Sequence, residues 1–130
     1  MDDTLMLEQW IMSTDEDQPI VEDVVVGYDD KLNLVVRLIC TDYEEEGCNS
    51  SVSAIVNKDG AFKLAKRLSL KMTELPARIA ECFEEYGEIV NSSFSDASRC
   101  FCEIIEAFVD EKCRYSIRHQ RDKYGLSPLN

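Results

Sequence analysis

Hydrophobic and polar residues alternate through the first half of the chain, a pattern that predicts β-strands. Since successive side chains of a strand point to opposite faces, the segment 32–41 would place its apolar residues on one face. These residues are Leu32, Leu34, Val36, Leu38 and Cys40. Asn33 and Arg37 fall on the other face, which indicates that this second face contacts water, as in an antiparallel sheet.

The segment before it, residues 20–28, is predicted to pair with 32–41 as a hairpin. It is rich in valine and runs into Gly27-Tyr28-Asp29-Asp30. Glycine and aspartate tolerate the backbone angles of a tight reversal, so this cluster is typical of a turn between two strands.

Two more strands are expected around this hairpin. One follows the charged loop 43–47 and carries Val52, Ala54 and Val56 on one side. Residues 5–13 fit either a strand or a helix capped by Asp3 or Thr4, and we favour a strand.

The second half of the chain has helical periodicity. Asn57 or Asp59 offers an N-cap to a first helix, whose apolar residues recur every three or four positions. A second helix is expected to begin near Thr73, with Pro76 in its first turn, and to reach Val90.

A third helix is predicted from an N-cap at Ser95. One stripe of helical spacing comprises Cys102, Ile105, Val109, Cys113, Ile117 and Tyr124, and an adjoining stripe comprises Phe101, Ile104, Phe108 and Tyr115. Since no glycine or proline interrupts the pattern before Gly125, we favour one helix over 95–124. The alternative ends the helix near Lys112 and makes 113–119 a short strand.

The chain is therefore expected to be an α+β protein. It would have an N-terminal antiparallel sheet of three to four strands followed by three helices, the last one long. The 130 residues fit a single domain, 1–130, in which 1–57 are mainly β and 58–130 mainly α. No internal repeat or linker divides the sequence.

The distribution of charge along the chain indicates which kinds of partner the protein can bind. The formal net charge is −12, and residues 1–46 hold 14 acidic residues against only Lys31 and Arg37. Beyond residue 46 the charges balance in blocks, which sum to +4 over 58–73, −8 over 74–111 and +4 over 112–130. Such a chain repels nucleic acid and anionic membranes, so we expect no direct contact with either and a protein partner with a basic surface.

The sequence also predicts where the protein is located and whether its cysteines are reduced. No run approaches the ~18–20 apolar residues that span a membrane, and the acidic start Met1-Asp2-Asp3 is unlike a signal peptide, so a cytoplasmic protein is expected. The six cysteines are then expected to be reduced thiols, several of them in the core, although an even number would suit three disulfides in a secreted chain. A zinc site is disfavoured because Cys-x-x-Cys is lacking and because Cys100 and Cys102, two apart on a helix, do not share a face.

Catalytic chemistry has little support in the sequence. The one histidine, His119, lies between Arg118 and Arg121, and neither a nucleophile motif nor a phosphate-binding glycine loop is present. The pair Asp29-Asp30 is typical of a solvated turn. We therefore expect no enzyme activity, no cofactor and no metal.

The acidic residues leave three hypotheses. They could form a solvated surface, a docking surface for a basic partner, or a carboxylate metal site. The metal site is disfavoured because no Asp-x-Asp-x-Asp-Gly loop is present. The predicted function is a small acidic protein-binding protein, an inhibitor or immunity factor that occupies a basic site on a partner protein. The alternative is a chaperone or adaptor that binds a client segment through apolar contacts. The contact residues predicted for the first function lie on turns and are Asp29, Asp30, Glu44, Glu45 and Glu46.

The basic end of the last helix also has two explanations. Its positive charges complement the negative end of a helix dipole, which requires no function. A helix longer than its own core could instead pair with a second copy, so a homodimer through the last helix is the alternative.

Overall fold

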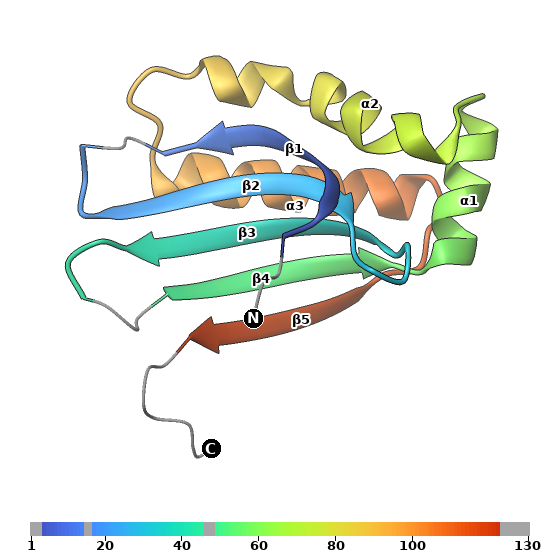
Figure 1. Ribbon diagram of the computed structural model, residues 1–130. Helices are drawn as coiled ribbons and strands as arrows, with labels where there is room; N and C mark the ends of the chain where they lie inside the picture. Colours follow the sequence, from blue (N-terminus) through green and yellow to red (C-terminus); the bar gives the residue numbers. More distant parts are fainter. Residues whose placement is uncertain (1–3, 15–16, 46–48, 123–130) are drawn as a thin grey trace.

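A five-stranded antiparallel sheet carries all the helices on one of its faces (Figure 1). The computed structural model describes residues 4–14, 17–45 and 49–122. In chain order its elements are β1 (Met6–Ser13), β2 (Ile20–Tyr28), β3 (Leu34–Asp42), β4 (Asn49–Val56), α1 (Lys58–Arg67), the 3₁₀ helix η1 (Met72–Glu74), α2 (Leu75–Cys82), the 3₁₀ helix η2 (Glu84–Glu88), α3 (Phe94–Asp110) and β5 (Ser116–Asp122). The strands lie side by side in the order in which they occur in the sequence. None of the described helices is long and apolar enough to cross a membrane.

The alternating pattern located the first four strands. β2 and β3 form the predicted hairpin, with Val24 opposite Leu38 and Val26 opposite Val36. Residues 6–13 form β1, which confirms the strand favoured for that ambiguous segment. The fold class α+β is confirmed, but the sheet has five described strands and not three or four, because the chain returns to it after the helices.

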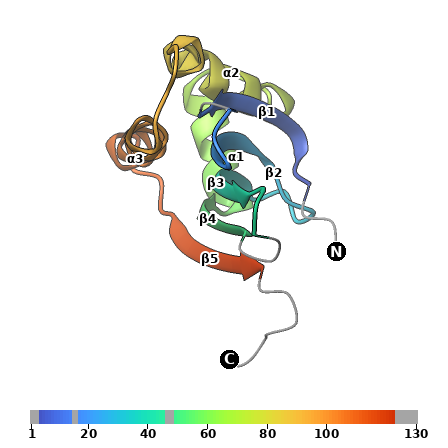
Figure 2. The same cartoon turned by 90° about the vertical axis from the view of Figure 1, so that its left-hand side faces the viewer.

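The main core lies between the helices and the sheet face that they cover, called here the helix face. α2 packs on β1 and β2, and α3 packs on β2 and β3 (Figure 2). The fully buried residues of this core alternate along the strands and recur on the helices, and include Val24, Val26, Leu34, Val36, Val56, Leu75 and Ile104. This burial of apolar area is the dominant favourable contribution to folding.

α3 ends at Asp110, so the favoured continuous helix over 95–124 is wrong. Lys112 adopts a left-handed backbone with φ of 59°, and the N–H of Cys113 donates to the carbonyl of Phe108 at 2.8 Å. The N–H of Lys112 donates to the carbonyl of Val109 at 3.0 Å. Together with the buried Phe108 and Cys113, these bonds form a Schellman ending. The chain then turns back and forms β5 beside β4, close to the strand of the alternative prediction.

The buried stripe of α3 also differs from the one expected to be continuous. Cys102 and Val109 are exposed, and Ile105 is only half-buried. The buried residues of α3 are Ala97, Cys100, Phe101, Ile104 and Phe108. The adjoining stripe therefore faces the sheet. Because α3 ends at Asp110, the long helix on which the homodimer hypothesis was based is not formed, and the homodimer itself stays a prediction.

The caps of the helices are close to those expected. Asn57 caps α1 as predicted, and its side-chain oxygen accepts from the N–H of Gly60 at 2.8 Å. The cap of α3 is Ser93 and not Ser95, because Ser93 and Asp96 form a reciprocal capping box that Ser95 cannot form with its own third residue, Ser98.

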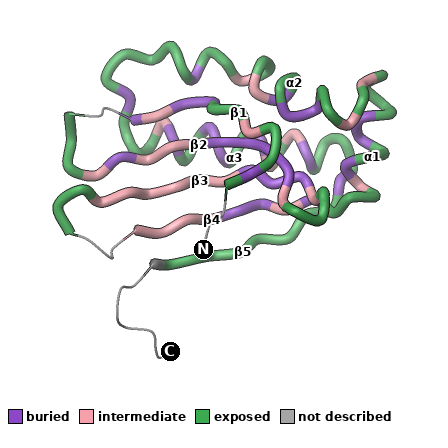
Figure 3. The backbone as a smooth tube through the Cα atoms, viewed as in Figure 1, coloured by how far each residue is buried: buried purple, intermediate pink, exposed green. Residues whose placement is uncertain are grey.

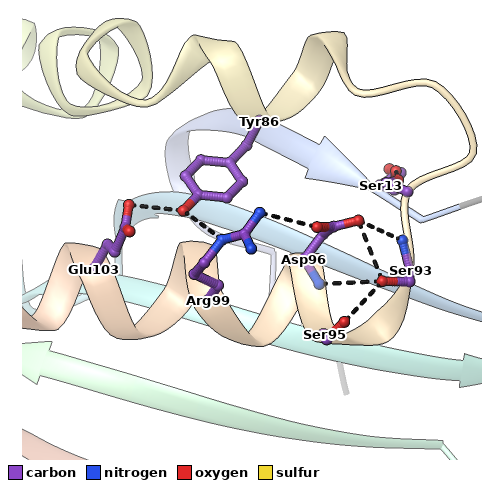
Figure 4. Close-up of polar contacts among 8 residues, drawn as sticks. Ser13, Tyr86, Ser93, Ser95, Asp96, Arg99 and Glu103 are labelled. Atoms are coloured by element: carbon purple, nitrogen blue, oxygen red, sulfur yellow. Dashed lines mark hydrogen bonds and ion pairs between the residues drawn. The ribbon is translucent and has the colours of Figure 1, made fainter.

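The segment predicted as one helix over 73–90 is divided. α2 ends at Cys82, and η2 follows with Tyr86 buried at its centre. The hydroxyl of Tyr86 donates to Glu103 Oε1 at 2.7 Å and accepts from Arg99 Nε at 3.3 Å, and Arg99 also pairs with Asp96 at 3.0 Å (Figure 4). This network fastens η2 onto α3.

The opposite face of the sheet, called here the outer face, carries a second and smaller cluster. Leu5, Val25 and Val35 are buried there, with Ile39 and Ile55 half-buried beside them. Figures 1 and 2 show that the start of the described chain crosses the sheet on this side, away from the helices.

Gly27 permits this crossing. A Cβ atom at Gly27 would lie 2.8 Å from Leu5 Cβ, 2.8 Å from the carbonyl oxygen of Met6 and 3.2 Å from Glu8 Cα. The backbone bends at Leu7, which has a φ of 54°, and the register of β1 against β2 shifts between Met6 and Gln9. Only a residue without a side chain allows the two segments to approach this closely.

We predict that Gly27→Ala lowers the free energy of unfolding by about 1–3 kcal/mol, because the added methyl group meets backbone atoms that cannot rotate away. Urea unfolding followed by circular dichroism measures the change. Ser116→Ala, on an exposed strand, is the control and should alter stability by less than about 0.5 kcal/mol. Equal stability of the Gly27→Ala variant and the unchanged protein would contradict the close crossing.

Candidate functional site

The carboxylates predicted to contact a partner do not form one cluster. Asp29 and Asp30 lie in the turn between β2 and β3, whereas Glu44 and Glu45 lie in the loop that leaves the other end of β3. The nine residues of β3 separate the two groups by about 30 Å at 3.3 Å per residue. Glu46 lies outside the described residues.

Asp29 holds its own turn together. Its Oδ1 accepts from the backbone N–H groups of Lys31 and Asn33, each at 2.9 Å, and its Oδ2 accepts from Asn33 Nδ2 at 3.0 Å. Burial alone would raise the pKa of Asp29, but these hydrogen bonds and the charge of Arg118 outweigh it and lower that pKa. Asp30 is exposed beside it. Of this pair, Asp30 is the residue whose side chain is available to a partner.

Glu44 and Glu45 project from a loop with a fixed backbone. Asp42 Oδ1 accepts from the N–H groups of both residues at 3.0 Å, and the N–H of Asp42 donates to Asn49 Oδ1 at 2.9 Å. Both glutamates are exposed. The loop therefore presents two carboxylates at a defined place, next to Tyr43.

Tyr43 belongs to a pocket of about 340 Å³ lined by Trp10, Val21, Asp23 and Tyr43, called here the aromatic pocket. Trp10 is 59% exposed and Tyr43 is 70% exposed, which is unusual for side chains of this size. The Tyr43 N–H donates to the carbonyl of Pro19 at 2.8 Å, which holds the residue against the start of β2.

The carboxylate of the aromatic pocket comes from β2. Asp23 is opposite Ser13 of β1, and its Oδ1 accepts from Ser13 Oγ at 2.5 Å. Trp10 is opposite Val25, and Val21 and Asp23 follow the same alternation, so the pocket opens on the outer face, near the β1 edge.

This arrangement suits a basic side chain. The face of an indole or phenol ring attracts an ammonium or guanidinium group, and a carboxylate beside the rings adds a direct charge interaction. The aliphatic stem of a lysine or arginine would lie against Val21. The acidic residues of the following loop, Glu44 and Glu45, extend the same preference beyond the pocket.

A second, apolar cleft of about 410 Å³ lies at the other end of the sheet. Its residues are Leu7, Tyr28, Leu32, Lys58, Asp59, Phe62, Met72 and Thr73. The hydroxyl of Tyr28 donates to the carbonyl of Met72 at 2.7 Å, and burial raises the pKa of Tyr28 to about 12. Phe62 is 54% exposed at this cleft, so the cleft could receive an apolar side chain.

The described cysteines and His119 line neither of these two pockets. Cys100 and Cys113 are buried, Cys40 is half-buried, Cys82 and Cys102 are exposed, and none of these five described cysteines is in a disulfide. Burial raises the pKa of the Cys100 thiol to about 12, which makes it a core residue and not a nucleophile. Within the described ranges no three His, Cys, Asp or Glu side chains gather as a metal site. His119 is exposed on β5.

Sequence analysis missed the aromatic pocket. Trp10 and Tyr43 lie more than 30 positions apart, and only the pairing of β1 with β2 and the loop after β3 bring them together. By alternation Trp10 shares a face of the predicted strand 5–13 with Met6 and Met12, so the sequence pattern gave no signal that this tryptophan would be exposed.

Comparison with other proteins does not supply a function. The chain matches no family model, no curated protein and no solved structure.

We predict that Asp29→Ala destabilises the protein by about 1 kcal/mol at neutral pH, because the turn loses the acceptor of its hydrogen bonds, whereas Asp30→Ala changes stability by less than about 0.5 kcal/mol. Since the folded-state pKa of Asp29 is lowered, its contribution is present above the ordinary value of 3.8 and is lost as the pH falls through the folded value. Urea unfolding at pH 7 and pH 3 checks both effects. Equal loss from the two variants would show that Asp29 does not hold the turn.

Glu22 makes the stability of the folded protein depend on pH with a sign opposite to that of Asp29. Its Oε1 is buried and has no hydrogen-bond partner, and burial raises the pKa of Glu22 above its ordinary value of 4.5. A raised carboxyl pKa favours the folded state below pH 4.5, and this advantage is lost as the pH rises through the folded value. We predict that Glu22→Gln is more stable than the unchanged protein at pH 7 but not at pH 4, as measured by thermal unfolding. A difference that is equal at the two pH values would refute this explanation.

Proposed function

We propose that this protein acts by binding and not by catalysis, and that it occupies a basic site on a partner protein as an inhibitor or immunity factor does. The observation that carries the proposal is the aromatic pocket, where the exposed Trp10 and Tyr43 accompany Asp23 and adjoin the loop of Glu44 and Glu45. A lysine or arginine of the partner would enter the pocket, and neighbouring basic residues would meet the loop.

The free energies that such interactions typically contribute favour the pocket over the isolated carboxylates as the main source of affinity. A cation over an aromatic ring contributes about 0.5–2 kcal/mol, whereas an exposed ion pair contributes about 0–1 kcal/mol. Tryptophan and tyrosine are also enriched among the residues that dominate binding energy at protein interfaces. The net charge of −12 would mainly accelerate the encounter with a basic partner, an effect that salt screens.

The apolar cleft supports a second candidate function. A chaperone or adaptor would place an apolar side chain of its client against Leu7, Leu32 and Phe62. Binding of that kind would depend on Phe62 and would persist at high salt, whereas binding through the aromatic pocket would weaken as the salt concentration rises.

The aromatic pocket can be tested directly because Trp10 is the only tryptophan and its fluorescence reports on its surroundings. The probe is the peptide acetyl-Gly-Lys-Gly-Lys-Gly-Lys-Gly-amide. We expect a saturable change in Trp10 emission that weakens between 50 mM and 500 mM NaCl, because part of the attraction is ionic. The same peptide with norleucine in place of lysine should leave the emission unchanged.

Variants assign the binding to the pocket. Tyr43→Ala and Asp23→Asn should each weaken binding of the lysine peptide by about 5- to 20-fold, equivalent to about 1–2 kcal/mol. Tyr115→Ala, at a tyrosine 39% exposed just before β5, is the matched control and should have no effect. Equal binding of the norleucine peptide, or an unchanged affinity in both pocket variants, would exclude the proposed site.

A further inference from the structure

β5, which forms one edge of the sheet, is the most exposed of the described strands. β4 pairs with β5 along one side, and among the described strands none pairs with the other side. Every residue from Ser116 to Arg121 is exposed, and Figure 3 shows this strand in one colour while the neighbouring strands are buried or half-buried. An edge strand presents unpaired N–H and C=O groups, to which an extended segment can add as a further strand.

The helix layer leaves room for such a segment. α3 lies over β2 and β3, and β5 extends beyond it (Figure 2). Ile117, opposite the buried Ala54, is 43% exposed on the helix face, and His119 follows it opposite Val52. A strand added to β5 would therefore find an apolar neighbour on the helix face.

The charge of this edge determines what it can receive. β5 contains Arg118 and Arg121 and one acidic residue, Asp122, at its end, and Arg114 precedes the strand, in a chain whose net charge is −12. Arg118 is opposite Ser53, on the outer face, and Arg121 is opposite Ser50, on the helix face. Both faces of the added strand would therefore lie next to an arginine.

We propose that β5 is a docking edge for an acidic extended segment of another protein, which adds to the sheet as a sixth strand. Carboxylates of that segment lie beside Arg118 and Arg121, and an apolar residue lies beside Ile117. A second copy of this chain is the poorer occupant, because antiparallel pairing of two β5 strands brings Arg118 and Arg121 of each copy close to those of the other.

This edge and the aromatic pocket are complementary in charge preference. The pocket lies near the β1 edge and suits a basic group, whereas β5 forms the opposite edge and suits an acidic one. The two sites therefore select different chemical features of a partner, and each can fail a test without affecting the other.

The probe is the peptide acetyl-Thr-Glu-Thr-Val-Glu-Val-Thr-amide. Paired antiparallel to β5, it places its two glutamates opposite Arg121 and Arg118 and a valine opposite Ile117. Amide hydrogen exchange of the full chain is followed by NMR with and without the peptide. We expect at least tenfold slower exchange at the outward amides of β5, since the peptide backbone accepts from them, and no change at the amides of α1.

Matched controls separate strand addition from simple attraction of charges. The same peptide with lysine in place of glutamate should not protect β5, and the same peptide with alternate N-methylated residues should bind at least tenfold more weakly. In the chain, Arg118→Glu with Arg121→Glu should weaken binding at least tenfold. Lys63→Glu with Lys66→Glu, an equal change of charge on the exposed surface of α1, should weaken it less than twofold.

Protection of β5 by the acidic peptide alone, lost in the arginine variant and kept in the α1 variant, supports the docking edge. Unchanged exchange at β5 in the presence of millimolar peptide overturns it. Equal protection by the lysine peptide overturns it as well. Protection of β5 that rises with protein concentration without any peptide would assign the edge to a second copy and would also overturn the proposal.

Discussion

The junction between the ends of α1 and α3 sets the path of the chain after Lys112. Arg67, the last residue of α1, donates to the carbonyl oxygen of Glu111 and pairs with Glu111 Oε1 at 3.3 Å. The same guanidinium reaches Cys113 Sγ at 3.7 Å. A cation at the end of α3 satisfies a carbonyl that the helix leaves unbonded and complements the negative end of its dipole. The left-handed Lys112 then directs the chain back to β4, and without this turn there would be no fifth strand.

The sheet that results separates two kinds of surface. The helix face is covered from β1 to β3 and holds the main core, whereas the outer face is covered only where the start of the described chain crosses Gly27. Among the described strands, the residues classed as exposed belong to the two edge strands, β1 and β5. The aromatic pocket lies near one edge and the arginines of β5 lie on the other, so the binding features follow from the way in which the core is closed.

Most of the sheet could be predicted from the sequence because alternation is a local signal. β2 and β3 form the predicted hairpin, and β1 and β4 lie where apolar residues alternate. The sequence left the end of α3 between two alternatives, and the longer helix was wrongly favoured because the usual signal for a left-handed cap is glycine and the residue here is Lys112. α1 ends in the same way at Ser69, with φ of 59°, so in this chain packing and not glycine determines where these helices end.

The candidate site was less accessible to sequence analysis. Asp29 and Glu44 were predicted from turn composition, but whether a turn carboxylate projects or is used by its own backbone depends on hydrogen bonds that the sequence does not display. Trp10 and Tyr43 meet only through strand pairing, and Asp23 joins them from a third segment. The periodicity of apolar residues locates helices and strands. A pocket formed by three separate segments can be recognised only when the arrangement of those segments in space is known.

The late position of β5 has a consequence for synthesis of the chain. β4 and β5 are neighbours in the sheet, yet the three helices separate them in the sequence. While the ribosome is still making residues 57–115, β4 is the outermost strand of the partial sheet, and its apolar residues Val52, Ala54 and Val56 border an unpaired backbone. Such an edge is prone to pair with other nascent chains. Addition of β5 replaces that edge with a strand that carries Arg118 and Arg121, and charged residues on an edge strand oppose edge-to-edge pairing.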